Sequence, residues 1–159
     1  AETGDEVSSS LSKIEENVAL VQNIDFFYPN VNDGQFYYKT RQVSFKTNDI
    51  TRKVLEEAYK EPVSGGLGKV FSPNTKINSL YLNKDNRVYI DLNKAFVTEM
   101  NAGAEYEGMI LQCIANTVGR YYGVEEIILT IDDQLYESGH LSFKKGQAIP
   151  VKGEGATKM

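Results

Sequence analysis

Few side chains in this sequence could take part in covalent catalysis. The chain contains one cysteine, Cys113, and one histidine, His140, among 159 residues. A serine or cysteine nucleophile needs a base, most often histidine, to accept its proton. Cys113 falls on the apolar side of a predicted helix, whereas His140 follows in a polar segment near the end of the chain. We therefore predict that Cys113 is a buried, unreactive thiol and that no catalytic dyad or triad is present.

A glycine-rich segment resembles a phosphate-binding loop only in part. Gly65, Gly66 and Gly68 precede Lys69, as glycines precede the lysine of a P-loop. The segment lacks the full spacing and the Ser or Thr after the lysine, and it follows a predicted helix instead of opening one. Phosphate binding is therefore not expected. We predict a surface loop instead, and its candidate interaction residues are Gly65, Gly66, Leu67, Gly68 and Lys69.

The carboxylates are numerous and follow no catalytic or metal-binding motif. Asp132 and Asp133 are adjacent, and neighbouring residues of a strand point to opposite faces, so a hairpin turn explains them better than a catalytic pair. A single cysteine cannot form a zinc site of the cysteine-cluster type. We predict no catalytic residues, no metal site and no cofactor. A hydrolase that uses an unrecognised carboxylate pair or His140 is kept as an alternative.

Aromatic residues occur in short runs. The chain has ten tyrosines and seven phenylalanines, and adjacent aromatics occur in two predicted strands and at the end of a predicted helix. Neighbouring strand residues face opposite sides, so such runs should place rings outside the core unless both faces of the sheet are covered. Tyr28, Tyr37 and Tyr122 are therefore candidate exposed aromatics that could dock a partner.

A long amphipathic helix is the strongest structural signal. Over residues 102–122, apolar side chains recur at the i, i+3, i+4, i+7 spacing that places them on one helix face. These side chains are Tyr106, Met109, Ile110, Cys113, Ile114, Thr117, Val118 and Tyr121. Gly123 should end the helix in a left-handed conformation. The alternating Ile127, Leu129 and Ile131 predict a strand directly after it, which should share the core of the helix.

The remaining segments alternate between strand and helix patterns. Two strands over residues 18–28 and 35–45 should form a hairpin, and Asn48 or Asp49 should cap a helix that ends at Glu61. Further strands are predicted over residues 77–83, 87–92, 125–132 and 135–136. This order predicts an α+β fold in which a mixed β-sheet carries two helices packed on one face.

The composition indicates one domain between two tails. Residues 1–17 are predicted to be a flexible acidic tail or tether, residues 18–146 a single domain and residues 147–159 a flexible tail. The net charge of −5 comes without a basic stripe, so nucleic-acid binding is not expected. The sequence has no apolar run of about 18 residues, so no membrane-spanning helix is predicted. The single cysteine excludes an internal disulfide.

The order and spacing of several segments resemble the GerMN domain of bacterial sporulation and spore-germination proteins. The resemblance covers roughly residues 20–145. The matching segments are FFYPN, ITRKVLEEAYKEP, SGGLGKVFSPNTKI, INSLYLNKDNRVYIDLNKAF, EGMILQCIANTVGRYYGVEEIILTIDDQ and SGHLSF. Each segment is a packing or turn pattern, and their combination is what resembles the family.

The resemblance implies a fold similar to the ring-building-motif domains of secretion and sporulation channel assemblies. It also implies a non-enzymatic, extracytoplasmic interaction domain that acts as a scaffold or assembly factor for a membrane-associated complex. The expected partners are other proteins of a sporulation or cell-envelope complex. The domain itself is expected at the membrane or the cell wall. It would contact the membrane only through an anchor that the given residues lack. A cell-wall carbohydrate-binding module that binds peptidoglycan is the main alternative.

Overall fold

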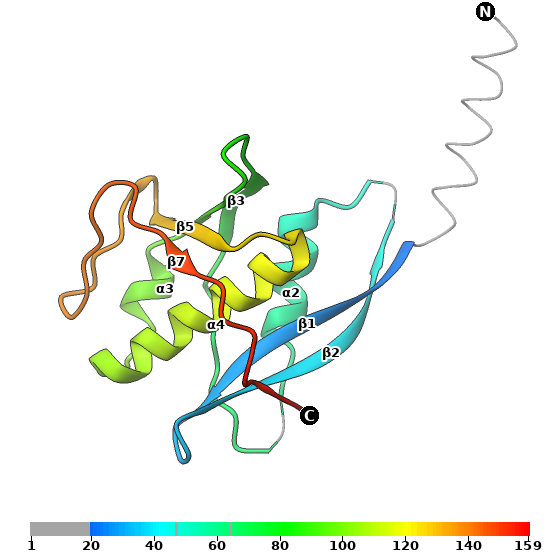
Figure 1. The fold of residues 1–159 in the computed structure, drawn as a ribbon, viewed down its shortest axis with the longest axis horizontal. Helices are drawn as coiled ribbons and strands as arrows, with labels where there is room; N and C mark the ends of the chain where they lie inside the picture. Colours follow the sequence, from blue (N-terminus) through cyan, green and yellow to red (C-terminus); the bar gives the residue numbers. More distant parts are fainter. Residues whose placement is uncertain (1–19, 47, 64) are drawn as a thin grey trace, which may run out of the picture.

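A computed structural model describes residues 20–46, 48–63 and 65–159 (Figure 1). The predicted acidic tail over residues 1–17 lies outside them. The elements in chain order are β1 Leu20–Asn30, β2 Gln35–Phe45, α2 Thr51–Lys60, β3 Ile77–Leu82, β4 Val88–Leu92, α3 Ala95–Thr98, α4 Ala104–Tyr122, β5 Glu126–Ile131, β6 Gln134–Leu135, β7 Ile149–Pro150 and β8 Thr157–Lys158. The predicted hairpin, both predicted helices and the central strands are therefore confirmed.

The strands divide between two sheets. β1 and β2 form an antiparallel hairpin, and β8 runs parallel to β2. The second sheet has the order β3-β4-β5-β6, with β4 and β5 parallel, and β7 pairs with β5. The α+β class is confirmed, although the prediction placed the strands in a single mixed sheet. α4 lies between the β1–β2 hairpin and the second sheet and packs on both (Figure 1).

The long helix is buried more widely than its apolar stripe predicts. The stripe residues Ile110, Cys113 and Ile114 are buried as predicted, but so are Ala115 and Gly119 on the adjacent side. The chain after β7 covers that side: a methyl group added at Gly119 would lie 2.2 Å from a methyl carbon of Val151. The helix ends at Gly123, which has a φ of 72° and forms the left-handed cap that the sequence predicts.

The C-terminal segment differs from its prediction. Residues 147–159 were expected to be a flexible tail, yet they contain β7 and β8. The side chain of Asn116 on α4 accepts a hydrogen bond from the N–H of Lys152 and donates one to its carbonyl. Because Asn116 is fully buried, these bonds satisfy both ends of its amide and attach the segment to the domain.

Two local features were predicted, the turn after β5 and the cap of α2, and only the first is confirmed. Asp132 and Asp133 form the turn between β5 and β6, with φ values of 47° and 62°, so the turn prediction is confirmed. The buried Asp91 accepts a hydrogen bond from the N–H of Asp133 and holds this turn. The predicted cap of α2 is wrong, because α2 begins after Ile50 without a side-chain cap and the Asp49 carboxylate accepts the N–H of Lys46 instead.

A buried hydrogen-bond network joins β1 to both long helices. The N–H of Phe27 donates to Thr117 Oγ1 at 3.0 Å, and the Tyr59 hydroxyl donates to the Phe27 carbonyl at 2.5 Å. Thr117 Oγ1 lies 2.9 Å from Tyr59 Oη and 2.8 Å from the Cys113 carbonyl, and its single proton can be donated to one of them. Side chains of α2 and α4 therefore form hydrogen bonds with the N–H and carbonyl of Phe27 at the edge of β1, where another strand would otherwise pair.

Replacing Thr117 with Val tests this network because Val has the same shape and no hydroxyl. The N–H of Phe27 would stay buried without an acceptor, so the free energy of unfolding in urea should fall by about 1–3 kcal/mol. Thr117→Ser, which keeps the oxygen, should lose less. The exposed Thr157→Val should change stability by less than about 0.5 kcal/mol. A Thr117→Val protein as stable as the wild type would show that the network does not stabilise the fold.

Candidate functional site

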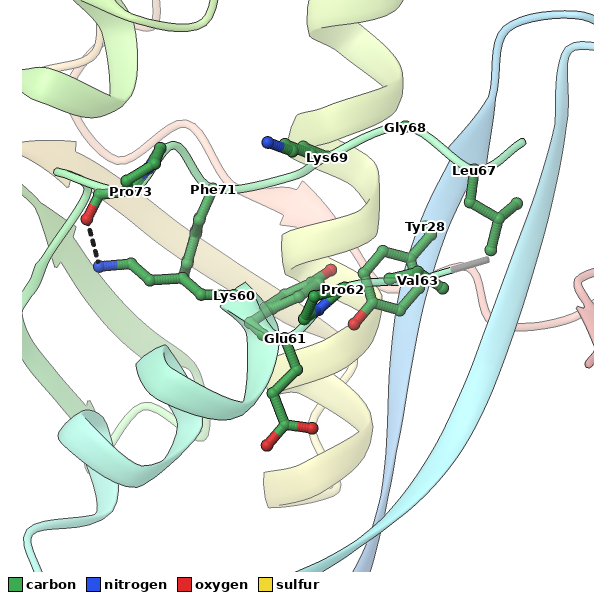
Figure 2. A pocket seen from close by; sticks show the side chains of 11 residues that line it. Tyr28, Lys60, Glu61, Pro62, Val63, Leu67, Gly68, Lys69, Phe71 and Pro73 are labelled. Carbon is green, nitrogen blue, oxygen red and sulfur yellow. Dashed lines mark hydrogen bonds between the residues drawn. The ribbon is translucent and has the colours of Figure 1, made fainter. Parts of the chain in front are cut away.

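The candidate site is a cavity of about 440 Å³ beside the loop that follows α2. It is lined by Tyr28, Tyr59, Lys60, Glu61, Pro62, Val63, Leu67, Gly68, Lys69, Phe71 and Pro73. Figure 2 shows the loop from Leu67 to Pro73 passing along one side and the end of α2 along the other, with Tyr28 and Phe71 at opposite ends. The site is called the loop cavity below.

Hydrogen bonds fix both margins of the loop cavity. Pro62 follows the end of α2, and the Lys60 ammonium donates to the Pro73 carbonyl at 3.0 Å (Figure 2). On the other margin, the N–H of Gly68 donates to the Pro29 carbonyl of β1 at 2.7 Å. The loop is therefore attached to α2 and to β1, which keeps the cavity open between them.

Backbone conformation and close packing explain why three positions of this loop are glycine. Gly65 and Gly66 have φ values of 84° and 76°, which favour glycine. A Cβ atom at Gly68 would lie 1.7 Å from the Tyr106 hydroxyl, so this position admits no side chain unless Tyr106 moves. Turn geometry and close packing thus account for the pattern that partly resembles a P-loop.

The structure places three of the five predicted loop residues at the cavity. Leu67, Gly68 and Lys69 line it, whereas Gly65 and Gly66 are exposed outside it. Leu67 is half-buried and packs against the core, and Lys69 is exposed. An apolar contact and a cation therefore lie next to each other at the margin of the cavity.

Tyr28 was predicted to be exposed, and this prediction is wrong because its side chain is 1% exposed. Both faces of β1 are covered: Tyr28 packs edge-on against Tyr59, while Phe27 on the opposite face lies under the guanidinium of Arg120. Among the described residues, the buried Tyr28 hydroxyl has no hydrogen-bond partner, and the same holds for Arg41 Nε. Burial raises the pKa of Tyr28.

The other two candidate aromatics are half-buried and lie away from the loop cavity. Tyr37 is on β2, and its hydroxyl donates to the carboxylate of Asp33 in the hairpin turn. Tyr122, at the end of α4, packs edge-on against Tyr121 with ring centroids 4.9 Å apart. The three predicted aromatics therefore do not form one surface.

A second polar cluster was not predicted. The Glu107 side chain is 2% exposed, accepts the Tyr136 hydroxyl and lies 3.3 Å from Nδ1 of His140, whose side chain is 52% exposed. Glu107 precedes Ile110 and Ile114 by three and seven positions, so its place on the buried face was readable from the sequence. Its contact with His140 depends on the fold. Through these contacts, Glu107 of α4 binds the segment that follows β6 and orients the imidazole of His140.

Among the described residues, neither the loop cavity nor the cluster of Glu107, Tyr136 and His140 forms an activated nucleophile or a metal site. Cys113 is fully buried, as predicted, and burial raises the pKa of its thiol. Within the described ranges, no hydrogen bond joins Cys113 to His140, and no group of three or more His, Cys, Asp or Glu side chains is arranged to hold a metal ion. None of the helices in the described part of the chain is long and apolar enough to cross a membrane.

Residues 25–137 match the family described as Germane: Sporulation and spore germination. A candidate lipoprotein from Clostridium perfringens has 19% identity and a TM-score of 0.51 over 84% of this chain and 87% of its own. The first GerMN domain of the sporulation protein GerM from Bacillus subtilis has 18% identity and a TM-score of 0.51, covering 87% and 97% of the two chains. The structure of the tandem GerMN domains of the same protein has 17% identity and a TM-score of 0.52, and the match covers 85% of this chain and 45% of that one. At these identities the structures share the fold, and no curated protein sequence matches the chain.

The buried tyrosines predict alkaline unfolding. The pKa values of Tyr59 and Tyr136 are raised above 10.0, chiefly by burial, so the native state keeps two protons that the unfolded chain releases. Their stabilising contribution is complete below about pH 10 and falls as the pH rises, by about 1.4 kcal/mol per pH unit for each phenol.

Phenolate absorbance followed together with circular dichroism measures this effect. We expect a late group of tyrosines that ionises only as the secondary structure is lost, and a smaller loss of stability per pH unit in Tyr136→Phe. If all ten tyrosines ionised together near pH 10 in a folded protein, the burial of these phenols would be contradicted.

Proposed function

Because the chain belongs to the Germane family of sporulation and spore germination domains, we propose that it is a non-enzymatic interaction domain that docks a protein of the cell envelope. In this proposal it acts outside the cytoplasm as a scaffold or assembly factor for a membrane-associated complex. The observation that carries the proposal is the loop cavity, where apolar walls and the exposed charge of Lys69 occur together.

The walls of the loop cavity suit an inserted apolar side chain. Phe71 and Tyr59 are buried core residues, with ring centroids 5.0 Å apart, and Leu67 and Val63 are half-buried at the margin. Binding sites with a few well-packed apolar anchors concentrate the energy of protein interfaces. The hydrogen bonds at both margins keep these walls in position, which lowers the entropy lost on binding.

The polar groups suit a partner segment with an acidic residue beside its apolar anchor. Lys69 is exposed at the margin and has no salt bridge within the described residues, whereas Lys60 on the other side is paired with Glu56 at 3.5 Å. These features give the site a chemical preference in addition to an apolar shape.

A role without catalysis is supported by how the reactive groups are used. Cys113 is buried, and both carboxylate oxygens of Glu107 contact neighbouring side chains. An envelope location is supported by the names of the structures with this fold, a candidate lipoprotein and a sporulation protein.

Two substitutions in the host gene test the docking proposal. Lys69→Glu should leave the melting temperature unchanged because Lys69 is exposed, whereas Leu67→Asp should lower it because Leu67 packs against the core, so its binding is measured below the transition. They should weaken partner binding by roughly tenfold or more, since each removes a contact expected at the centre of the interface. Counts of heat-resistant spores and of germinating spores should fall accordingly.

Leu135→Asp and Lys145→Glu are matched controls, because they make the same changes at exposed positions outside the loop cavity. Both should behave as the wild type. Normal sporulation and germination of the Leu67→Asp and Lys69→Glu strains, with the proteins present at wild-type levels, would refute docking at this site.

A further inference from the structure

Two hollows on another part of the surface meet at Tyr122. One, of about 650 Å³, lies between the start of β1, residues 22–25, and the end of α4 at residues 120–121. The other, of about 370 Å³, lies between residues 50–52 at the start of α2 and residues 78–81 of β3. Tyr122 lines both, and the two hollows on either side of this residue are together called the Tyr122 groove below.

Aromatic rings are held in place along the Tyr122 groove. Tyr121 and Tyr122 lie nearly perpendicular, with 87° between their planes, and the Tyr121 hydroxyl donates to the side-chain carbonyl of Gln22. In the second hollow, Tyr81 is 49% exposed and stacks on Tyr89, with centroids 5.5 Å apart and planes 6° from parallel. Rings fixed by neighbouring side chains offer a ligand flat apolar surfaces at little entropic cost.

Hydrogen-bonding side chains line the same two hollows. Among the described residues, no hydrogen bond engages the side chains of Asn23, Thr51 or Ser79, which all line the groove. Arg120 is paired with Asp25 at 2.9 Å. Arg52 donates to the Ile77 carbonyl at 3.2 Å and has no salt bridge to a described carboxylate, so most of its five donors remain available.

We propose that the Tyr122 groove binds an oligosaccharide of acetamido sugars that carries a carboxylate. A pyranose ring has an apolar face of C–H groups and an edge of hydroxyls, which match the combination of tyrosine rings with amide and hydroxyl side chains in the groove. The guanidinium of Arg52, which has no salt bridge within the described residues, selects the carboxylate, because arginine binds carboxylates in a bidentate geometry. This site is separate from the loop cavity and shares none of its lining residues.

The test compares two soluble probes on the isotope-labelled chain. One is a cell-wall glycan fragment with free lactyl carboxylates, and the other is chitotetraose, which has acetamido groups and no carboxylate. We expect the fragment to shift the backbone amides of residues 22–25, 50–52, 79–81 and 120–122. Chitotetraose should bind about tenfold more weakly. An absence of shifts in the wild type, or shifts confined to other residues, would overturn the proposal whatever the variants do.

Variants then assign the contacts. Tyr122→Ala should weaken binding of both probes by about tenfold or more, and Arg52→Gln should remove the preference for the carboxylate. Tyr37→Ala, a half-buried tyrosine outside the groove, is the control and should bind as the wild type. Lys69→Glu should also bind both probes normally, so a failure of the docking proposal leaves this one intact. A folded Tyr122→Ala protein with unchanged affinity would refute the site.

Discussion

The hydroxyl of Thr117 occupies a position on which the arrangement of this domain depends. It accepts the N–H of Phe27 at the edge of β1, while the Tyr59 hydroxyl binds the carbonyl of the same residue. The edge of a strand normally pairs with another strand or stays in water, because an unpaired backbone group is costly when buried. Here α4 and α2 take that place. This explains why the strands form two sheets with α4 between them, where the prediction had one (Figure 1).

The same constraint positions both candidate sites, which lie toward opposite ends of β1. Beyond Phe27, the carbonyl of Pro29 anchors the loop at Gly68, and Tyr28 forms one end of the loop cavity. Before Phe27, residues 22–25 form one wall of the Tyr122 groove. Tyr59 belongs to the network and to the cavity wall at once. The hydrogen-bond network at Phe27 therefore lies between the proposed docking cavity and the proposed groove.

Local patterns predicted most of the elements, and long-range contacts account for what the sequence did not show. The period of the long helix and the cap at Gly123 are set within neighbouring turns. By contrast, β7 and β8 have two residues each, too few to show a period, and they form because distant strands offer them partners. Tyr28 was predicted to be exposed because an isolated strand has one wet face. In the domain, Tyr59 of α2 packs edge-on against Tyr28, and the guanidinium of Arg120, from the other half of the chain, lies over Phe27 on the opposite face, so both faces of β1 are covered.

The most direct test of the docking account is site-specific photocrosslinking in sporulating cells. A photoreactive residue at position 67 places the probe at the margin of the loop cavity, and one at position 135 places it on exposed β6 as a reference. The account predicts that position 67 forms a discrete adduct with one envelope protein and that position 135 does not. Equal labelling from both positions, or no adduct from position 67 while the protein is present and sporulation proceeds, would contradict it.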